Sequence, residues 1–112
     1  MFFKKPRVKS RAYLDFVATL PCLIYGIEDG TVSGHHLLKT GMRGIGLKSP
    51  DDYVVPLSHA AHQCLHITCG NEEDFFKLSG INNQVEIAQA LYGHWVNKQY
   101  EAARELVLRR GK

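Results

Sequence analysis

Long apolar runs are absent from the sequence. No stretch approaches the ~18 consecutive apolar residues that a membrane span requires, so we expect a soluble protein without membrane contact. The first residues, Met-Phe-Phe-Lys-Lys-Pro-Arg, place charges after the apolar residues, and no long apolar segment follows them. A secretory signal peptide has the opposite order, so we expect a cytoplasmic location.

Cysteine is scarce and odd in number. The three cysteines are Cys22, Cys64 and Cys69. An odd count without an export signal argues against a disulfide framework and leaves free thiols or metal ligation. Repeats and low-complexity tracts are also missing beyond the first residues. With 112 residues there is room for one modest core, so residues 11–112 are expected to form a single domain.

Net charge is only +3, but the positive residues gather at the two ends of the chain. The N-terminal group contains Lys4, Lys5, Arg7, Lys9 and Arg11, and the C-terminal group contains Arg104, Arg109, Arg110 and Lys112. Residues 1–10 have too little apolar surface to fold alone, so they are expected to form a flexible basic arm. Two interpretations remain open: a solvated tail, or an arm that contacts phosphates and gains affinity by releasing counterions.

Apolar periodicity and capping residues predict an α+β fold. Helices are expected over roughly 11–19 after an N-cap at Ser10, and from Ser58 through the histidine-rich segment. Strands are expected over 31–36 and 53–57, with a glycine-rich cationic loop between them that carries Arg43 and Lys48.

Two more helical segments are expected in the C-terminal part. A short helix capped by Asn71 would contribute Phe75, Phe76 and Leu78 to the core and end at Gly80. A long segment from Asn82 or Asn83 would carry one apolar stripe through Val107, which Gly93 weakens or kinks. Trp95 and the tyrosines on this stripe favour a core role over a base-stacking one. His94 is expected to be solvated or to cap the helix.

The histidines are spaced in a way that is typical of a metal-binding site. Five of the six histidines lie in two segments, 32–36 and 54–66, and His59, His62 and His66 have the spacing i, i+3, i+7 that shares one helical face. With His35 and His36 on the preceding strand, this layout can bring three imidazoles around a divalent cation and leave a fourth free. The alternative is that the helical histidines are surface residues without a ligand.

The chain also resembles a known family in a set of short motifs that occur in the same order. The motifs are Leu20-Pro21-Cys22-Leu, Gly34-His35-His36-Leu37, Gly44-Ile-Gly46-Leu-Lys48, Asp51, Val55-Pro56-Leu57, His62-x3-His66, Gly70-Asn-Glu72, Phe75-Phe76 and Gly80-Ile81. In these motifs the chain resembles the phage-encoded HNH endonucleases of the Ref type, from about Arg11 to Trp95.

This resemblance implies a ββα-metal (HNH) finger, in which a two-stranded hairpin and a helix pack against flanking N- and C-terminal helices. It implies that His36 is the general base, that Asp51 orients it, and that the metal ligands are His35, His62 and His66. The metal would be Mg²⁺, Mn²⁺ or Zn²⁺, and the substrate DNA. The phosphate contacts would come from Lys4, Lys5, Arg7, Lys9, Arg11, Arg43 and Lys48. A host recombinase is a further candidate partner, and the cytoplasm would be that of a bacterial host cell if the protein is phage-encoded.

Departures from the family pattern concern a second, structural zinc site. Family members commonly have Cys-x2-Cys where this chain has Cys22-Leu-Ile-Tyr25, and a further cysteine where Ser58 stands. Two thiols are therefore missing and no structural zinc is expected, so apolar packing, for example by Tyr25, would have to replace it. His59 is either solvated or a steric substitute for a family histidine at the position of Ala61.

Three functions follow from these patterns. The first is a metal-dependent HNH endonuclease that hydrolyses DNA phosphodiester bonds, linked to recombination or DNA processing. The second is a DNA-binding or recombination-accessory protein that keeps the HNH fold without catalysis. The third is a structural metal-binding interaction module without nucleic acid.

Overall fold

The computed structural model describes residues 9–37, 51–69 and 72–111. In this part of the chain, two strands form one antiparallel sheet and helices surround it, so the predicted α+β class is confirmed. The elements are α1 (Arg11–Val17), β1 (Ser33–His36), β2 (Val54–Leu57), α2 (His59–Cys64), α3 (Glu72–Leu78), α4 (Gln84–Val96) and α5 (Tyr100–Leu108). A 3-10 turn, Asp51–Tyr53, precedes β2, and a π-helical turn, Leu65–Cys69, follows α2.

Several predicted residues lie outside the described part. They are Lys4, Lys5, Arg7, Arg43, Lys48 and the expected cap Asn71. None of the helices in the described ranges has the length and apolar character needed to cross a membrane.

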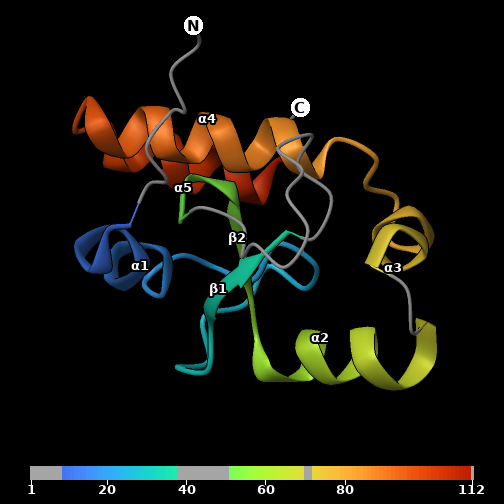
Figure 1. Cartoon of the computed structure of the whole chain (residues 1–112). Coiled ribbons are helices and arrows are strands. Elements are labelled where there is room, and N and C mark those ends of the chain that lie inside the picture. The colour runs from blue at the N-terminus through green and yellow to red at the C-terminus, as the bar shows by residue number, and fades with distance from the viewer. Residues whose placement is uncertain (1–8, 38–50, 70–71, 112) are drawn as a thin grey trace, which may run out of the picture.

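The hairpin places a polar strand beside an apolar one. In its register His35 lies opposite Val55 and His36 opposite Val54. All four residues of β2 are buried, whereas β1 is exposed or half-buried along its length. Figure 1 shows the hairpin in the middle of the molecule, with α4 on one side and α2 on the other. The core therefore supports the sheet through β2, and β1 is the less buried strand of the two.

Gly34 lets α1 approach β1 closely. A Cβ at this position would lie 3.3 Å from Leu14 Cδ2 and 3.6 Å from Val54 Cβ. Ser10 caps α1 as predicted, since its hydroxyl accepts a hydrogen bond from Tyr13 N at 3.1 Å. The buried Tyr13 ring then meets α4, edge-on to Tyr92 at 5.0 Å between ring centroids and 5.2 Å from Trp95. Trp95 is therefore a packing residue, as expected from the stripe.

The last helical segment is broken, contrary to the prediction of one continuous stripe. The break lies at Lys98, whose φ is 57°, while Gly93 sits inside α4 with nothing within 4 Å of the Cβ it lacks. Asn97 Nδ2 donates to the Gly93 carbonyl at 2.9 Å and so satisfies an acceptor at the helix end. The chain then reverses and α5 lies beside α4 (Figure 1).

This break removes two residues from the expected core. Val96 is 54% exposed and Tyr100 is 48% exposed, because both flank the reversal. Leu78 is also a correction, since it is 78% exposed at the end of α3. It follows Phe76 by two residues, about 200° around the helix, and so points away from the face that buries Phe76. The predicted end at Gly80 is confirmed, with a φ of 82°.

The hydroxyl of Tyr13 predicts an unusual effect on stability. It is buried and, among the described residues, has no hydrogen-bond partner. Burial raises the pKa of Tyr13, and the nearby Asp52 carboxylate adds to this shift. Tyr13→Phe should raise the free energy of unfolding by about 1 kcal/mol in urea titrations, because it removes a buried group that lacks a partner.

Tyr53→Phe is the matched control. The Tyr53 hydroxyl accepts a hydrogen bond from Gln89 Nε2 at 3.0 Å, so removal of this hydroxyl should lower the free energy of unfolding by about 1 kcal/mol. Equal losses in both variants would contradict the assignment of an unpartnered hydroxyl to Tyr13.

Candidate functional site

The two histidines of β1 have different carboxylate partners. His35 Nε2 lies 2.6 Å from Glu72 Oε1, and His36 Nε2 lies 2.8 Å from Asp51 Oδ1. Successive strand residues point to opposite faces, which explains why adjacent rings reach different elements. Their exposure also differs, at 13% for the His35 side chain and 40% for that of His36. His36 is therefore the histidine of β1 that solvent can reach more easily.

Asp51 is held by two parts of the chain. Its Oδ1 meets His36, and its Oδ2 accepts a hydrogen bond from the Ser10 amide at 2.7 Å. An ionised carboxylate only accepts hydrogen bonds, so His36 Nε2 carries the proton and Nδ1 of the neutral ring is unprotonated. The Asp51 contact thus fixes the His36 ring with a proton-accepting nitrogen available.

His62 is the residue of α2 that meets the hairpin. Its ring centroid lies 5.3 Å from that of His35, with 64° between the ring planes. Burial lowers the pKa of His62, and repulsion from a charged His35 acts in the same direction. A hydrogen bond between this ring and the Ser58 backbone acts against these effects. Burial therefore favours the neutral ring, which is the form that binds metal ions.

His59 and His66 lie near His62 but are exposed. A charge on His66, and then one on His59, lowers the pKa of His62 further. His66 belongs to the π-helical turn, a feature that often occurs at functional sites. The exposure of His59 agrees with the solvated interpretation of this residue.

The donors present suit a divalent ion, although they do not enclose one. Imidazole and carboxylate groups are ordinary ligands of zinc and related metals. The contact between the His35 and His62 rings joins two of the three predicted ligands. Within residues 9–37, 51–69 and 72–111, no group of three or more His, Cys, Asp or Glu side chains is arranged to hold a metal ion.

Glu72 is a site residue that the sequence did not predict. Its contact with His35 spans 37 positions of the chain, so no local pattern could identify it. The only available signal was its place in the Gly70-Asn-Glu72 motif of the resemblance.

The cysteines near the missing zinc site have a different environment. Cys22 is buried and Cys64 is half-buried. The pKa of Tyr25 is raised by partial burial, then by Cys64, which is also its hydrogen-bond partner, and by Cys22. These three side chains are therefore neighbours, which the sequence did not indicate. Tyr25 is 48% exposed, so the expectation that it replaces the zinc by apolar packing is wrong.

Cationic residues at the two ends of the chain differ in their partners. Arg104 pairs with Glu28, Arg109 pairs with Glu105, and Arg110 donates to the carbonyls of Ser79 and Ile24. These C-terminal arginines are engaged within the protein.

The described N-terminal cations are Lys9 and Arg11, which are both exposed. Arg11 pairs with the exposed Asp15, at 3.2 Å. The basic arm also ends beside the histidine site, because the Ser10 amide binds Asp51.

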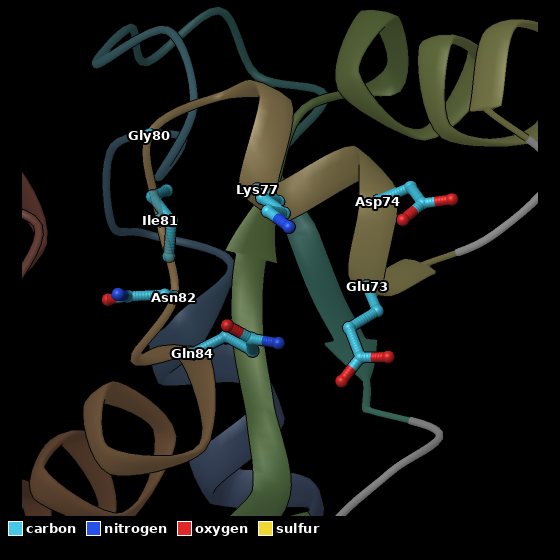
Figure 2. Close-up of a pocket in the computed structure, with 7 residues that line it drawn as sticks. All are labelled: Glu73, Asp74, Lys77, Gly80, Ile81, Asn82 and Gln84. Atoms are coloured by element: carbon cyan, nitrogen blue, oxygen red, sulfur yellow. The ribbon is translucent and has the colours of Figure 1, made fainter.

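A pocket of about 470 Å³ lies between α3 and the start of α4. Figure 2 shows it surrounded by Glu73, Asp74 and Lys77 of α3 and by Gln84 of α4. No predicted site residue lines it. Two carboxylates against one ammonium would repel a phosphate, so this pocket is not a place for the DNA backbone.

Asp51→Ala should destabilise the fold as well as release His36. It removes the partners of a ring nitrogen and of the Ser10 amide, so we expect the free energy of unfolding to fall by about 1–3 kcal/mol. Urea titration measures this loss. Asp15→Ala removes an exposed ion pair and should cost no more than about 0.5 kcal/mol. Similar costs for the two variants would show that the Asp51 contacts do not hold the site together.

Comparison with known proteins assigns the chain to one protein family. No curated protein and no solved structure matches the chain. The model of one family, described as a protein of unknown function (DUF968), matches residues 1–99 of the 112. This match covers the hairpin, the histidine helix and the residues of both carboxylate–histidine pairs, and its description names no activity. The chain belongs to the DUF968 family.

Proposed function

We propose that this protein is a divalent-metal-dependent endonuclease of the HNH type, which hydrolyses phosphodiester bonds of DNA. The observation that carries the proposal is the hydrogen bond between His36 Nε2 and Asp51, next to the contact between His35 and His62. In this arrangement His36 is suited to proton transfer, whereas His35 and His62 are suited to metal ligation.

His36 would act as the general base. Its Nδ1 is the ring nitrogen that Asp51 leaves unprotonated, and its side chain is 40% exposed, so a water molecule can reach it. When the ring takes a proton from water, the Asp51 carboxylate stabilises the imidazolium and keeps its orientation. The Ser10 amide holds Asp51 in turn.

His35, His62 and His66 would hold the metal. A divalent ion there, Mg²⁺, Mn²⁺ or Zn²⁺, would supply Lewis-acid polarisation of the phosphate and would stabilise the leaving 3′ oxygen. The lowered pKa of His62 supports this role, since a ligand must offer its neutral nitrogen.

The basic arm would bind the DNA backbone. Lys9 and Arg11 are exposed and lie one residue on either side of Ser10, which contacts Asp51. Phosphates bound there would lie near the His36 ring. The remaining predicted contacts, Lys4, Lys5, Arg7, Arg43 and Lys48, would extend this surface. The Ref resemblance adds a host recombinase as a candidate partner in the cytoplasm.

His36→Ala should lower the rate of plasmid nicking by about 10²- to 10⁴-fold, because it removes the general base. The assay compares Mg²⁺, Mn²⁺ and Zn²⁺, with and without a recombinase filament, and reports nicked and linear product. His94→Ala is the control, since His94 bonds to Gln99 at 2.8 Å at the α4–α5 reversal and lies outside the site. A wild-type protein that binds DNA but cuts it with none of these metals would be an accessory protein instead.

The arm can be tested separately through salt dependence. Replacing Lys4, Lys5, Arg7 and Lys9 by alanine should reduce the slope of log K against log salt by about 0.9 for each phosphate that the variant no longer neutralises. Fluorescence anisotropy with a labelled duplex measures this slope. Arg109→Ala should leave it unchanged, because Arg109 pairs with Glu105. An unchanged slope in the arm variant would favour the solvated-tail interpretation.

A further inference from the structure

Among the described residues, Glu72 is the only buried carboxylate, with 8% of the residue exposed. An ionised carboxylate is costly to bury unless hydrogen bonds or opposite charge compensate it. Its Oε1 lies 2.6 Å from His35 Nε2, and the two side chains are 6% and 13% exposed. The contact with His35 therefore helps to compensate the burial of Glu72.

The His35 ring is confined by three side chains from other elements. Glu72 meets its Nε2, the His62 ring centroid lies 5.3 Å away, and the Phe76 ring centroid lies 6.5 Å away. Phe76 is fully buried and belongs to the same helix as Glu72, so core packing of α3 determines where the carboxylate stands. Rotation of the His35 ring would break the bond to Glu72 and disturb packed neighbours.

We propose that Glu72 is a positioning residue for His35. Glu72 accepts a hydrogen bond from the Nε2–H group of His35, so Nδ1 is the unprotonated nitrogen of the neutral ring and is available to a divalent ion. A carboxylate behind a ligating imidazole fixes its tautomer and orientation and makes it a stronger donor. This role rests on the proposed metal binding of His35, but it does not require that the protein cut DNA.

His35 and His36 then form two carboxylate–imidazole pairs with different uses. In both, the carboxylate binds Nε2 and leaves Nδ1 unprotonated. The His36 pair is the more open one, where water can reach the nitrogen, while the His35 pair is enclosed beside His62. Both histidines pair with a carboxylate, so the pairing does not distinguish their proposed roles. The greater exposure of the His36 side chain is what suits it to proton transfer and His35 to metal ligation.

The test is metal affinity in the full-length chain. Competition titration with Zn²⁺ and a chelator should give a dissociation constant about 10- to 100-fold higher for Glu72→Gln than for wild type. Glu73→Gln makes the same change of charge one residue further along α3 at an exposed position, and its affinity should match wild type. Equal affinities for Glu72→Gln and Glu73→Gln would overturn the proposal, as would a wild-type chain that binds no Zn²⁺.

Two spectroscopic readouts separate positioning from other roles. In the metal-free protein, ¹⁵N shifts of the His35 ring should report the Nε2–H tautomer in wild type and a mixture of tautomers in Glu72→Gln. With Co²⁺ at saturation, both proteins should have the same absorption bands. Unchanged ¹⁵N shifts would refute the contact, and altered Co²⁺ bands would make Glu72 a direct ligand, which also overturns the positioning role.

A variant with a shorter acidic side chain keeps the proposal testable when Glu72→Gln does not fold. If Glu72→Gln does not fold, Glu72→Asp keeps the charge and should retain part of the Zn²⁺ affinity and the Nε2–H tautomer. Loss of the tautomer in a folded Glu72→Asp with unchanged affinity would contradict the proposal. Zn²⁺ binding that depends on Glu72 without DNA cleavage would refute the proposed nuclease and leave this inference standing.

Discussion

The Asp51 carboxylate joins three parts of the chain that are distant in sequence. Asp51 lies in the turn before β2. Its carboxylate is hydrogen-bonded to the His36 ring of β1 and accepts a hydrogen bond from the backbone amide of Ser10, at the start of α1. β1 needs such contacts, because its own residues, Ser-Gly-His-His, bring no aliphatic side chain to the core. The strand is held by its ladder with the buried β2, by the packing of Leu14 on Gly34 and by carboxylates bound to its two rings.

Local signals were readable from the sequence because their physical cause lies within a few residues. Ser10 and Ser58 cap α1 and α2 through hydrogen bonds to amides three residues ahead, and such caps follow from residue type alone. The helix that carries His59 and His62 is likewise local in origin, since it begins directly after the Ser58 cap.

Other features depended on contacts that a one-dimensional pattern does not contain. The reversal at Lys98 uses a left-handed conformation in a residue that is neither glycine nor asparagine, so it carries no turn signal. Glu72 looked like any acidic residue in a first helical turn, and only the docking of α3 brings it to His35 across 37 positions. The neighbourhood of Tyr25, Cys22 and Cys64 likewise arises from folding.

Gly34 connects the packing of α1 to the geometry of the histidines. Leu14 lies so close to Gly34 that an added methyl group would come within 3.3 Å of Leu14 Cδ2, and the leucine side chain would have to shift by a few tenths of an ångström. Because α1 starts at Ser10, and Ser10 binds Asp51, a tilt of this helix would move the oxygen that orients His36. The contact between Leu14 and Gly34, which involves no polar group, thus bears on the orientation of the His36 imidazole in β1, through Ser10 and Asp51.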